Sequence, residues 1–133
     1  MTNVVLETEN LTKAYGNKEV LHPTSISVRK GEILAVIGPS GAGKSMPLRL
    51  FDGLESPTSG DIRIFGEPFV RASRKKIRSR MGILFQKTVL FDRSVLDNIA
   101  LGLSYRRIPR AEQKRRAQKT LANLGMSEYA NRS

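Results

Sequence analysis

The sequence predicts an α/β fold in which a glycine-rich loop joins a buried strand to a helix. A continuous apolar run, rich in β-branched residues, occupies positions 33–37 (Ile-Leu-Ala-Val-Ile), and such a run is typical of a parallel strand buried on both faces. Glycine-rich residues follow it at once, and a helical segment follows these. With 133 residues, 39% of them hydrophobic and 26% charged, the chain is long enough for about one globular domain.

Local patterns predict the other elements of the first half. Residues 4–6 open a strand, and Ile26 and Val28 indicate a second one. The glycine-rich loop leads into a helix over residues 43–51, which is followed by a turn-rich segment. A short strand with alternating apolar residues is predicted over residues 61–65.

The second half predicts one more strand and two helices. Residues 81–85 are apolar enough to form the strand. Ser94, with Asp97 three residues later, is typical of a capping box at the start of a helix. A later helix begins near Pro109 and ends before Gly125. The residues expected to face inward on this last helix are Ala117, Leu121 and Leu124.

Composition excludes several kinds of site. The sequence has no cysteine and a single histidine, His22, which rules out a disulfide framework, a thiolate metal centre, a cysteine nucleophile and any site built on several histidines. No apolar run approaches the ~20 residues of a membrane-spanning helix, and residues 1–10 lack the sections of a signal peptide. We therefore expect a cytoplasmic protein.

The formal net charge of +11 is unevenly distributed. Residues 1–70 carry 7 Lys and Arg against 8 Asp and Glu, whereas residues 71–133 carry 16 against 4. Such an imbalance predicts a surface for polyanions, a surface for a protein partner, or a domain whose acidic complement lies elsewhere. No aromatic residue lies within the basic run at 71–80, and only Tyr105 is near the second basic run, at 107–119. This shortage of aromatic residues argues against nucleic acid as a partner.

The glycine-rich loop matches the pattern G-x-x-x-x-G-K-[ST] in full. Its residues are Gly38, Pro39, Ser40, Gly41, Ala42, Gly43, Lys44 and Ser45. Glycines let the backbone wrap closely around a phosphate chain, so that N–H groups and the positive end of the next helix face the anion. Lys44 supplies a charge for the β- and γ-phosphates, Ser45 a hydroxyl ligand for Mg²⁺, and Met46 a further backbone N–H. The loop therefore predicts binding of a nucleoside triphosphate.

Three further segments accompany the loop. They are Asn10-Leu11-Thr12-Lys13-Ala14-Tyr15-Gly16, Lys30-Gly31-Glu32-Ile33 and Leu54-Glu55-Ser56-Pro57-Thr58-Ser59-Gly60. In order and spacing the four segments resemble the N-terminal part of the ATP-binding subunit of an ABC transporter of the importer type, from about residue 4 to the end of the chain. The resemblance implies a partial P-loop NTPase core with an N-terminal antiparallel β-subdomain and the start of a helical subdomain.

The resemblance also implies ATP and Mg²⁺ as cofactors and assigns two more site residues. Tyr15 is the aromatic residue that stacks on adenine, and Gln86 is the glutamine that senses Mg²⁺ and lies near the membrane subunit. The implied partners are a transmembrane permease subunit and either a second ATPase or a complementary C-terminal half. The implied location is the cytoplasmic face of the cell membrane. Residues 1–70 then hold the β-subdomain and phosphate loop, and residues 71–133 the basic segment, the glutamine loop and the helices.

The sequence departs from the family pattern at several points. Met46 stands where the family usually has Thr, and Pro47 where it usually has an aliphatic residue. The Leu-Ser-Gly-Gly-Gln signature, the apolar strand ending in Asp-Glu and the switch histidine do not occur in these 133 residues. At the nearest substitute for the Asp-Glu pair, Asp92 is followed by Arg93. We therefore assign no catalytic residue and expect the chain to bind ATP without hydrolysing it alone.

Two other interpretations are open on the sequence. The loop and the basic half could form a module that binds nucleic acid or acidic lipid and has no role in transport. The chain could also be the product of a damaged gene, without function. Salt-sensitive binding to duplex DNA or anionic vesicles tests the first interpretation, and the DNA immediately downstream tests the second.

Overall fold

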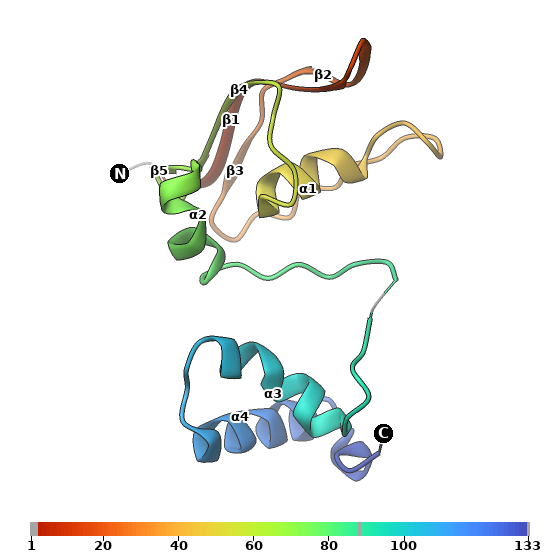
Figure 1. The fold of residues 1–133 in the computed structure, drawn as a ribbon, viewed down its shortest axis with the longest axis vertical. Helices are drawn as coiled ribbons and strands as arrows, with labels where there is room; N and C mark the ends of the chain where they lie inside the picture. Colours follow the sequence, from red (N-terminus) through yellow and green to blue (C-terminus); the bar gives the residue numbers. More distant parts are fainter. Residues whose placement is uncertain (1–2, 88, 133) are drawn as a thin grey trace. The chain divides into compact units, whose positions relative to one another are not determined.

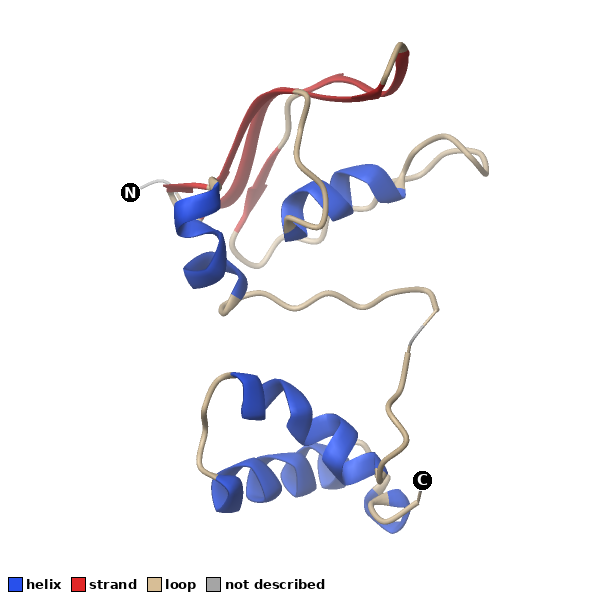
Figure 2. Cartoon of the chain, viewed as in Figure 1, coloured by secondary structure: helices blue, strands red, loops and turns tan. Residues whose placement is uncertain are grey.

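The computed structural model describes residues 3–87 and 89–132. They form two compact units, Met1–Ile83 (unit 1) and Leu84–Ser133 (unit 2), shown in Figures 1 and 2. Unit 1 contains β1 (Val4–Tyr15), β2 (Lys18–Thr24), β3 (Ser27–Arg29), α1 (Ser45–Asp52), β4 (Ser59–Ile64), β5 (Glu67–Pro68) and α2 (Arg71–Arg78). Unit 2 contains α3 (Val95–Tyr105), α4 (Arg110–Asn123) and the short 3-10 helix η1 (Ser127–Tyr129).

β1 is the centre of the antiparallel sheet of unit 1 (Figure 1). Along one edge it pairs with β3 and then, further along the chain, with β2, where Tyr15 lies opposite Lys18. Along the other edge it pairs with β4, and β5 pairs with β4 in turn. The strands predicted at residues 4–6, around Ile26 and Val28, and at residues 61–65 are confirmed, although β1 extends nine residues further, to Tyr15.

The change of partner along β1 takes place at Thr8, which is buried. Its backbone N–H donates to the carbonyl of Ile26 (2.9 Å), and its hydroxyl donates to the carbonyl of Thr24 (3.1 Å). The same hydroxyl accepts the backbone N–H of Ile26 (3.0 Å). Because buried polar groups need partners, this one side chain joins the end of β2 to the start of β3.

The core of unit 1 lies between the sheet and the two helices beside it. Leu50 of α1 and Ile77 of α2 are almost completely buried, and Ile62 and Ile64 of β4 face them with the period of two of a strand. The predicted helix after the loop is confirmed as α1 and ends at Gly53, which takes the left-handed conformation that closes a helix (φ +72°).

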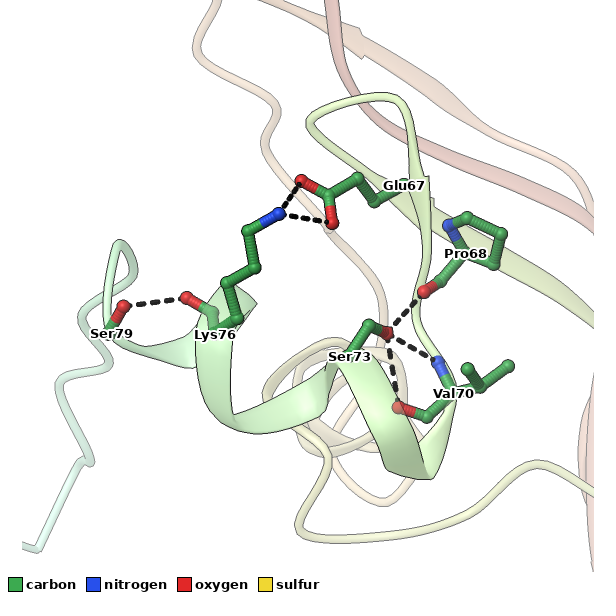
Figure 3. A network of polar contacts seen from close by, with 6 residues as sticks. All are labelled: Glu67, Pro68, Val70, Ser73, Lys76 and Ser79. Atoms are coloured by element: carbon green, nitrogen blue, oxygen red, sulfur yellow. Dashed lines mark hydrogen bonds and ion pairs between the residues drawn. The ribbon is translucent and has the colours of Figure 1, made fainter.

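Polar contacts fix the start and the middle of α2, as Figure 3 shows. The Ser73 hydroxyl accepts the backbone N–H of Val70 (3.2 Å), which would otherwise be unpaired at the start of the helix. The Lys76 ammonium lies 2.9 Å from one carboxylate oxygen of Glu67 and 3.0 Å from the other. The helix is thereby tied to β5.

Three arginines of the basic run at 71–80 also contact other parts of unit 1, outside α2. The pairs are Arg74 with the Gly53 carbonyl (3.3 Å), Arg78 with the Asp52 carboxylate (3.6 Å) and Arg80 with the Phe65 ring (3.8 Å to its centroid). Cations placed over aromatic rings and paired with partly buried acids stabilise packing. Much of the positive charge in this run therefore has an intramolecular role.

Two predicted strands are wrong for this structure. Residues 33–37 and 81–85 form no strand, and Ile33 and Ile37 are 94% and 93% exposed instead of buried. A strand requires a neighbour for its backbone N–H and C=O groups, and the strands within the described residues pair only with one another. In the resembled fold the neighbour of residues 33–37 carries the Asp-Glu pair, which this sequence does not contain.

In unit 2, α3 begins as the sequence predicts. The Ser94 hydroxyl accepts the backbone N–H of Asp97 (3.1 Å) and donates to its carboxylate (2.9 Å). The first N–H groups of the helix, on Val95 and Leu96, donate to carbonyls of residues 130 and 132 at the end of the chain. Among the described residues, no helix is both long enough and apolar enough to cross a bilayer.

α4 begins after Pro109, as predicted, and buries Ala117 and Leu121 against α3. The prediction that Leu124 faces inward is wrong, because this residue is the C-cap, lies beyond the last turn and is 65% exposed. In the first turn, Glu112 accepts hydrogen bonds from Arg115 and Arg116, each 2.6 Å away. These hydrogen bonds, chiefly the one from Arg115 and next the one from Arg116, lower the pKa of the Glu112 carboxyl to about 2.

Replacing Gly60 by alanine should disrupt the contact of β4 with β1. Gly60 has φ +83°, and a Cβ would overlap the Asn10 carbonyl and lie 2.5 Å from the Glu9 carbonyl oxygen. Gly66→Ala is the matched control, since Gly66 has φ +79° but nothing within 4 Å of its Cβ. In urea unfolding we expect Gly60→Ala to cost about 3–4 kcal/mol and Gly66→Ala about 1 kcal/mol. Equal costs would contradict the close approach.

The stability of α4 should depend on Glu112 in a defined pH range. Because the folded state lowers this pKa from 4.5 to about 2, the ionised carboxylate stabilises the fold above pH 4.5, and this contribution is lost as the pH falls towards 2. Thermal melting should therefore show the wild type more stable than Glu112→Gln at pH 7, with a difference that disappears near pH 2. Exposed Glu128→Gln is the control. A difference that is constant with pH would refute the ion pairs as its cause.

Candidate functional site

The glycine-rich loop forms an exposed turn between residues 33–37 and α1. Gly41 (φ +81°) and Gly43 (φ +80°) take the left-handed conformation, which costs glycine little. A Cβ on Gly43 would lie 2.9 Å from the carbonyl oxygen of Val20 in β2. Glycine is therefore required here for its backbone conformation and for the close approach of β2.

Lys44 folds back over the loop. Its Nζ donates to the carbonyl oxygens of Gly38 (2.9 Å) and Pro39 (2.6 Å). These bonds hold the ammonium beside the loop backbone, while the Lys44 backbone is the N-cap of α1. A cation next to the positive end of a helix dipole creates a local potential that attracts anions.

The loop also presents backbone donors. Within residues 3–87, the N–H groups of Gly41, Gly43 and Lys44 have no hydrogen-bond acceptor, and residues 38–42 are exposed. N–H groups that lack an acceptor, left-handed glycines and a lysine ammonium at the start of a helix are the features of a phosphate site. The residues present therefore fit the triphosphate of a nucleotide.

Met46 and Pro47, the two residues that depart from the family pattern, lie within α1 and do not prevent the helix from forming. Ser45 is the exposed first residue of α1, where its hydroxyl could bind Mg²⁺ next to a phosphate. The Met46 N–H donates to the Gly43 carbonyl (2.9 Å), and the Met46 side chain packs against the core. Pro47 falls in the first turn, where a missing N–H has little cost. A contribution of Met46 to phosphate binding stays a prediction.

Tyr15 lies at the end of β1 and is 49% exposed. The Lys13 ammonium lies 4.8 Å from the centroid of its ring and 3.2 Å from a carboxylate oxygen of Glu55. A hydrogen bond to Glu55 is the main cause that raises the pKa of the Tyr15 phenol. The same hydrogen bond is the largest cause that lowers the pKa of the Glu55 carboxyl, and the hydrogen bond from Lys13 is the second. Tyr15 thus belongs to a cluster of three interacting side chains.

Gln86 belongs to unit 2 and is exposed. The loop residues and Tyr15 belong to unit 1, so the pairing of Gln86 with Ser45 around a metal stays a prediction. In the described part of the chain, no group of three or more His, Asp or Glu side chains could hold a metal ion. A metal here would need oxygen atoms of a ligand as well as those of the protein.

Three residues next to the site were missed by sequence reasoning. Val20 approaches the loop through its backbone, for which the sequence carries no signal. Lys13 and Glu55 lie within two of the segments that resemble the family, but the resemblance gave them no role. Their nearness became evident only from the structure.

Comparisons with known proteins agree with this geometry. Residues 21–133 match the family described as "ABC transporter". The Methionine import ATP-binding protein MetN of Corynebacterium diphtheriae is 40% identical over 96% of this chain and 40% of its own length. The Spermidine/putrescine import ATP-binding protein PotA of Bacillus thuringiensis is 33% identical over 96% of this chain and 39% of its own. The chain thus spans 39–40% of the length of these relatives.

Two solved structures share the fold. The protein cbiO1 from Clostridium perfringens, part of the ABC transporter complex cbiONQ, matches with a TM-score of 0.83 and 27% identity over 98% of this chain and 54% of that one. The ATP-binding cassette MJ0796, dimeric and bound to ADP and Pi, matches with a TM-score of 0.82 and 27% identity over 95% of this chain and 60% of that one. These matches confirm the predicted partial P-loop NTPase core. Since the loop, the accompanying segments and the family match agree, the chain belongs to the ABC transporter family.

Proposed function

We propose that this chain binds ATP together with Mg²⁺, as the nucleotide-binding part of an ABC transporter ATPase that energises the import of a solute across a membrane. The observation that carries the proposal is the loop, where the N–H groups of Gly41, Gly43 and Lys44 find no acceptor among the residues that the structure describes and lie beside the Lys44 ammonium. The names of the relatives, which are import ATP-binding proteins, support import as the direction of transport.

Each site residue has a distinct role in this proposal. The loop, residues 38–44, surrounds the β- and γ-phosphates with its N–H groups, and the Lys44 ammonium exchanges its two carbonyl acceptors for phosphate oxygens. Tyr15 stacks on the adenine ring through its exposed side. Ser45 and Gln86 provide oxygen ligands for Mg²⁺, which neutralises phosphate charge when bound.

The same proposal names the partners and the location. Because cbiO1 is part of a transporter complex and MJ0796 is dimeric, we infer a transmembrane permease and a second ATPase subunit as partners, at the cytoplasmic face of the cell membrane. The 133 residues contain no Asp-Glu pair after an apolar strand and no signature segment. Since positioning of water and charge stabilisation provide phosphoryl-transfer catalysis, turnover needs groups beyond those of this chain.

A nucleic-acid or lipid-binding module is the weaker proposal. Lys76, Arg78 and Arg80 contact side chains of unit 1, and Arg115 and Arg116 share Glu112. Cations already paired within the chain contribute less to binding a polyanion, because that binding must first break or share the internal pairs.

Removing the Lys44 ammonium should weaken nucleotide binding. In calorimetric titrations with Mg·ATP, we expect Lys44→Ala to reduce affinity about ten- to a hundredfold, because charged hydrogen bonds to phosphate are lost. Lys30→Ala, at another exposed lysine of unit 1, is the control for charge and should bind as the wild type does. Equal affinity of the wild type and Lys44→Ala would rule out the loop as the binding site.

A further inference from the structure

The segment that follows α1 is joined to the end of β1 by several hydrogen bonds. The Thr58 N–H donates to the Thr12 carbonyl (2.9 Å), and the Thr58 hydroxyl accepts the Ala14 N–H (2.9 Å). The hydroxyls of Thr12 and Ser59 lie 2.7 Å apart. Residues 55–59 are therefore held along the last part of β1, the part that carries Tyr15.

Lys13 is at the centre of this contact. Its ammonium lies 3.2 Å from Glu55 Oε2 and donates to the Ser56 carbonyl (2.7 Å). The Lys13 and Glu55 side chains are 12% and 27% exposed, so both are more covered than is usual for a surface ion pair. An ammonium with two oxygen partners and an aromatic ring 4.8 Å away has little freedom to move.

The ring of Tyr15 is held by both members of this pair. The Lys13 ammonium lies over the ring, 4.8 Å from its centroid, and Glu55 in turn holds this ammonium at 3.2 Å. The other end of Glu55 is fixed too, because its backbone N–H donates to the Arg49 carbonyl of α1 (3.2 Å). α1 is the helix that begins at the phosphate loop, so the ring is tied to the same helix that bears the loop.

We propose that Glu55 is a positioning residue: it fixes the Lys13 ammonium, and Lys13 holds the Tyr15 ring in place for stacking on the nucleotide base. This proposal rests on the proposed function. Stacking contributes most when the ring is already oriented, because no rotamer freedom is then lost on binding. Glu55 touches no nucleotide atom in this account. Glu55 affects nucleotide affinity only through Tyr15, so it changes the contact with the base and leaves the contacts with the phosphates unchanged.

Two ligands separate this role from a general structural one. Mg·ATP uses both the loop and the base contact, whereas Mg·tripolyphosphate uses only the loop. We expect Tyr15→Ala and Glu55→Ala each to reduce affinity for Mg·ATP about tenfold, within the range of aromatic stacking on a base, and to leave affinity for Mg·tripolyphosphate unchanged. The double variant should lose no more than Tyr15→Ala does, because both substitutions remove the same contact.

Two further variants serve as controls. Glu55→Gln keeps an oxygen that can accept a hydrogen bond from the Lys13 ammonium, and we expect it to retain most of the affinity for Mg·ATP. Glu19→Ala removes a glutamate of β2 that is bonded to His22 rather than to Tyr15, and it should bind both ligands as the wild type does. Circular dichroism of each variant checks that the chain is folded.

The outcomes are distinguishable. Loss of affinity for both ligands in Glu55→Ala would show a structural role, and unchanged affinity for Mg·ATP would show no role; either result overturns the positioning proposal while the proposed function stands. A wild type that binds neither ligand would overturn the proposed function, and the positioning of Tyr15 with it.

Discussion

The hydrogen bonds along both edges of β1 hold unit 1 together. One edge pairs with β3 and β2, and the other with β4. The change of partner at Thr8 lets β2 diverge from β3 and reach the phosphate loop, where its Val20 carbonyl lies against Gly43. The end of β1 carries Tyr15. The phosphate loop and the aromatic residue are thus positioned from a single strand, and the close approach at Gly60 limits how β4 can sit against it.

Charge in this protein serves packing as well as binding. Most of the cationic side chains in the run at 71–80 contact Glu67, Asp52, Gly53 or Phe65. Lys13 is used in the same way at the opposite end of α1 from the loop. The Lys44 ammonium differs from these, because its acceptors are two exposed loop carbonyls, which an anionic ligand can replace. This difference explains why a net charge of +11 is a poor guide to the site.

Local signals in the sequence predicted local structure well. The capping pair Ser94 and Asp97 and the helix after the loop both involve residues within a few positions of one another. The predicted strand at 33–37 failed because a strand depends on a neighbour, which the apolar pattern does not reveal. The loop glycines were identified from the motif, whereas the Lys13, Tyr15 and Glu55 cluster joins positions some 40 residues apart and has no local signal.

The central claim is that the N–H groups of the loop bind a triphosphate, and amide NMR spectra of the chain titrated with Mg·ATP test it most directly. The account predicts that the largest shifts occur at Gly41, Gly43 and Lys44, whose N–H groups have no acceptor among the described residues. The amides of α2 and α4 should change little. The absence of shifts in the loop, or larger shifts along the basic helices than in the loop, would contradict it.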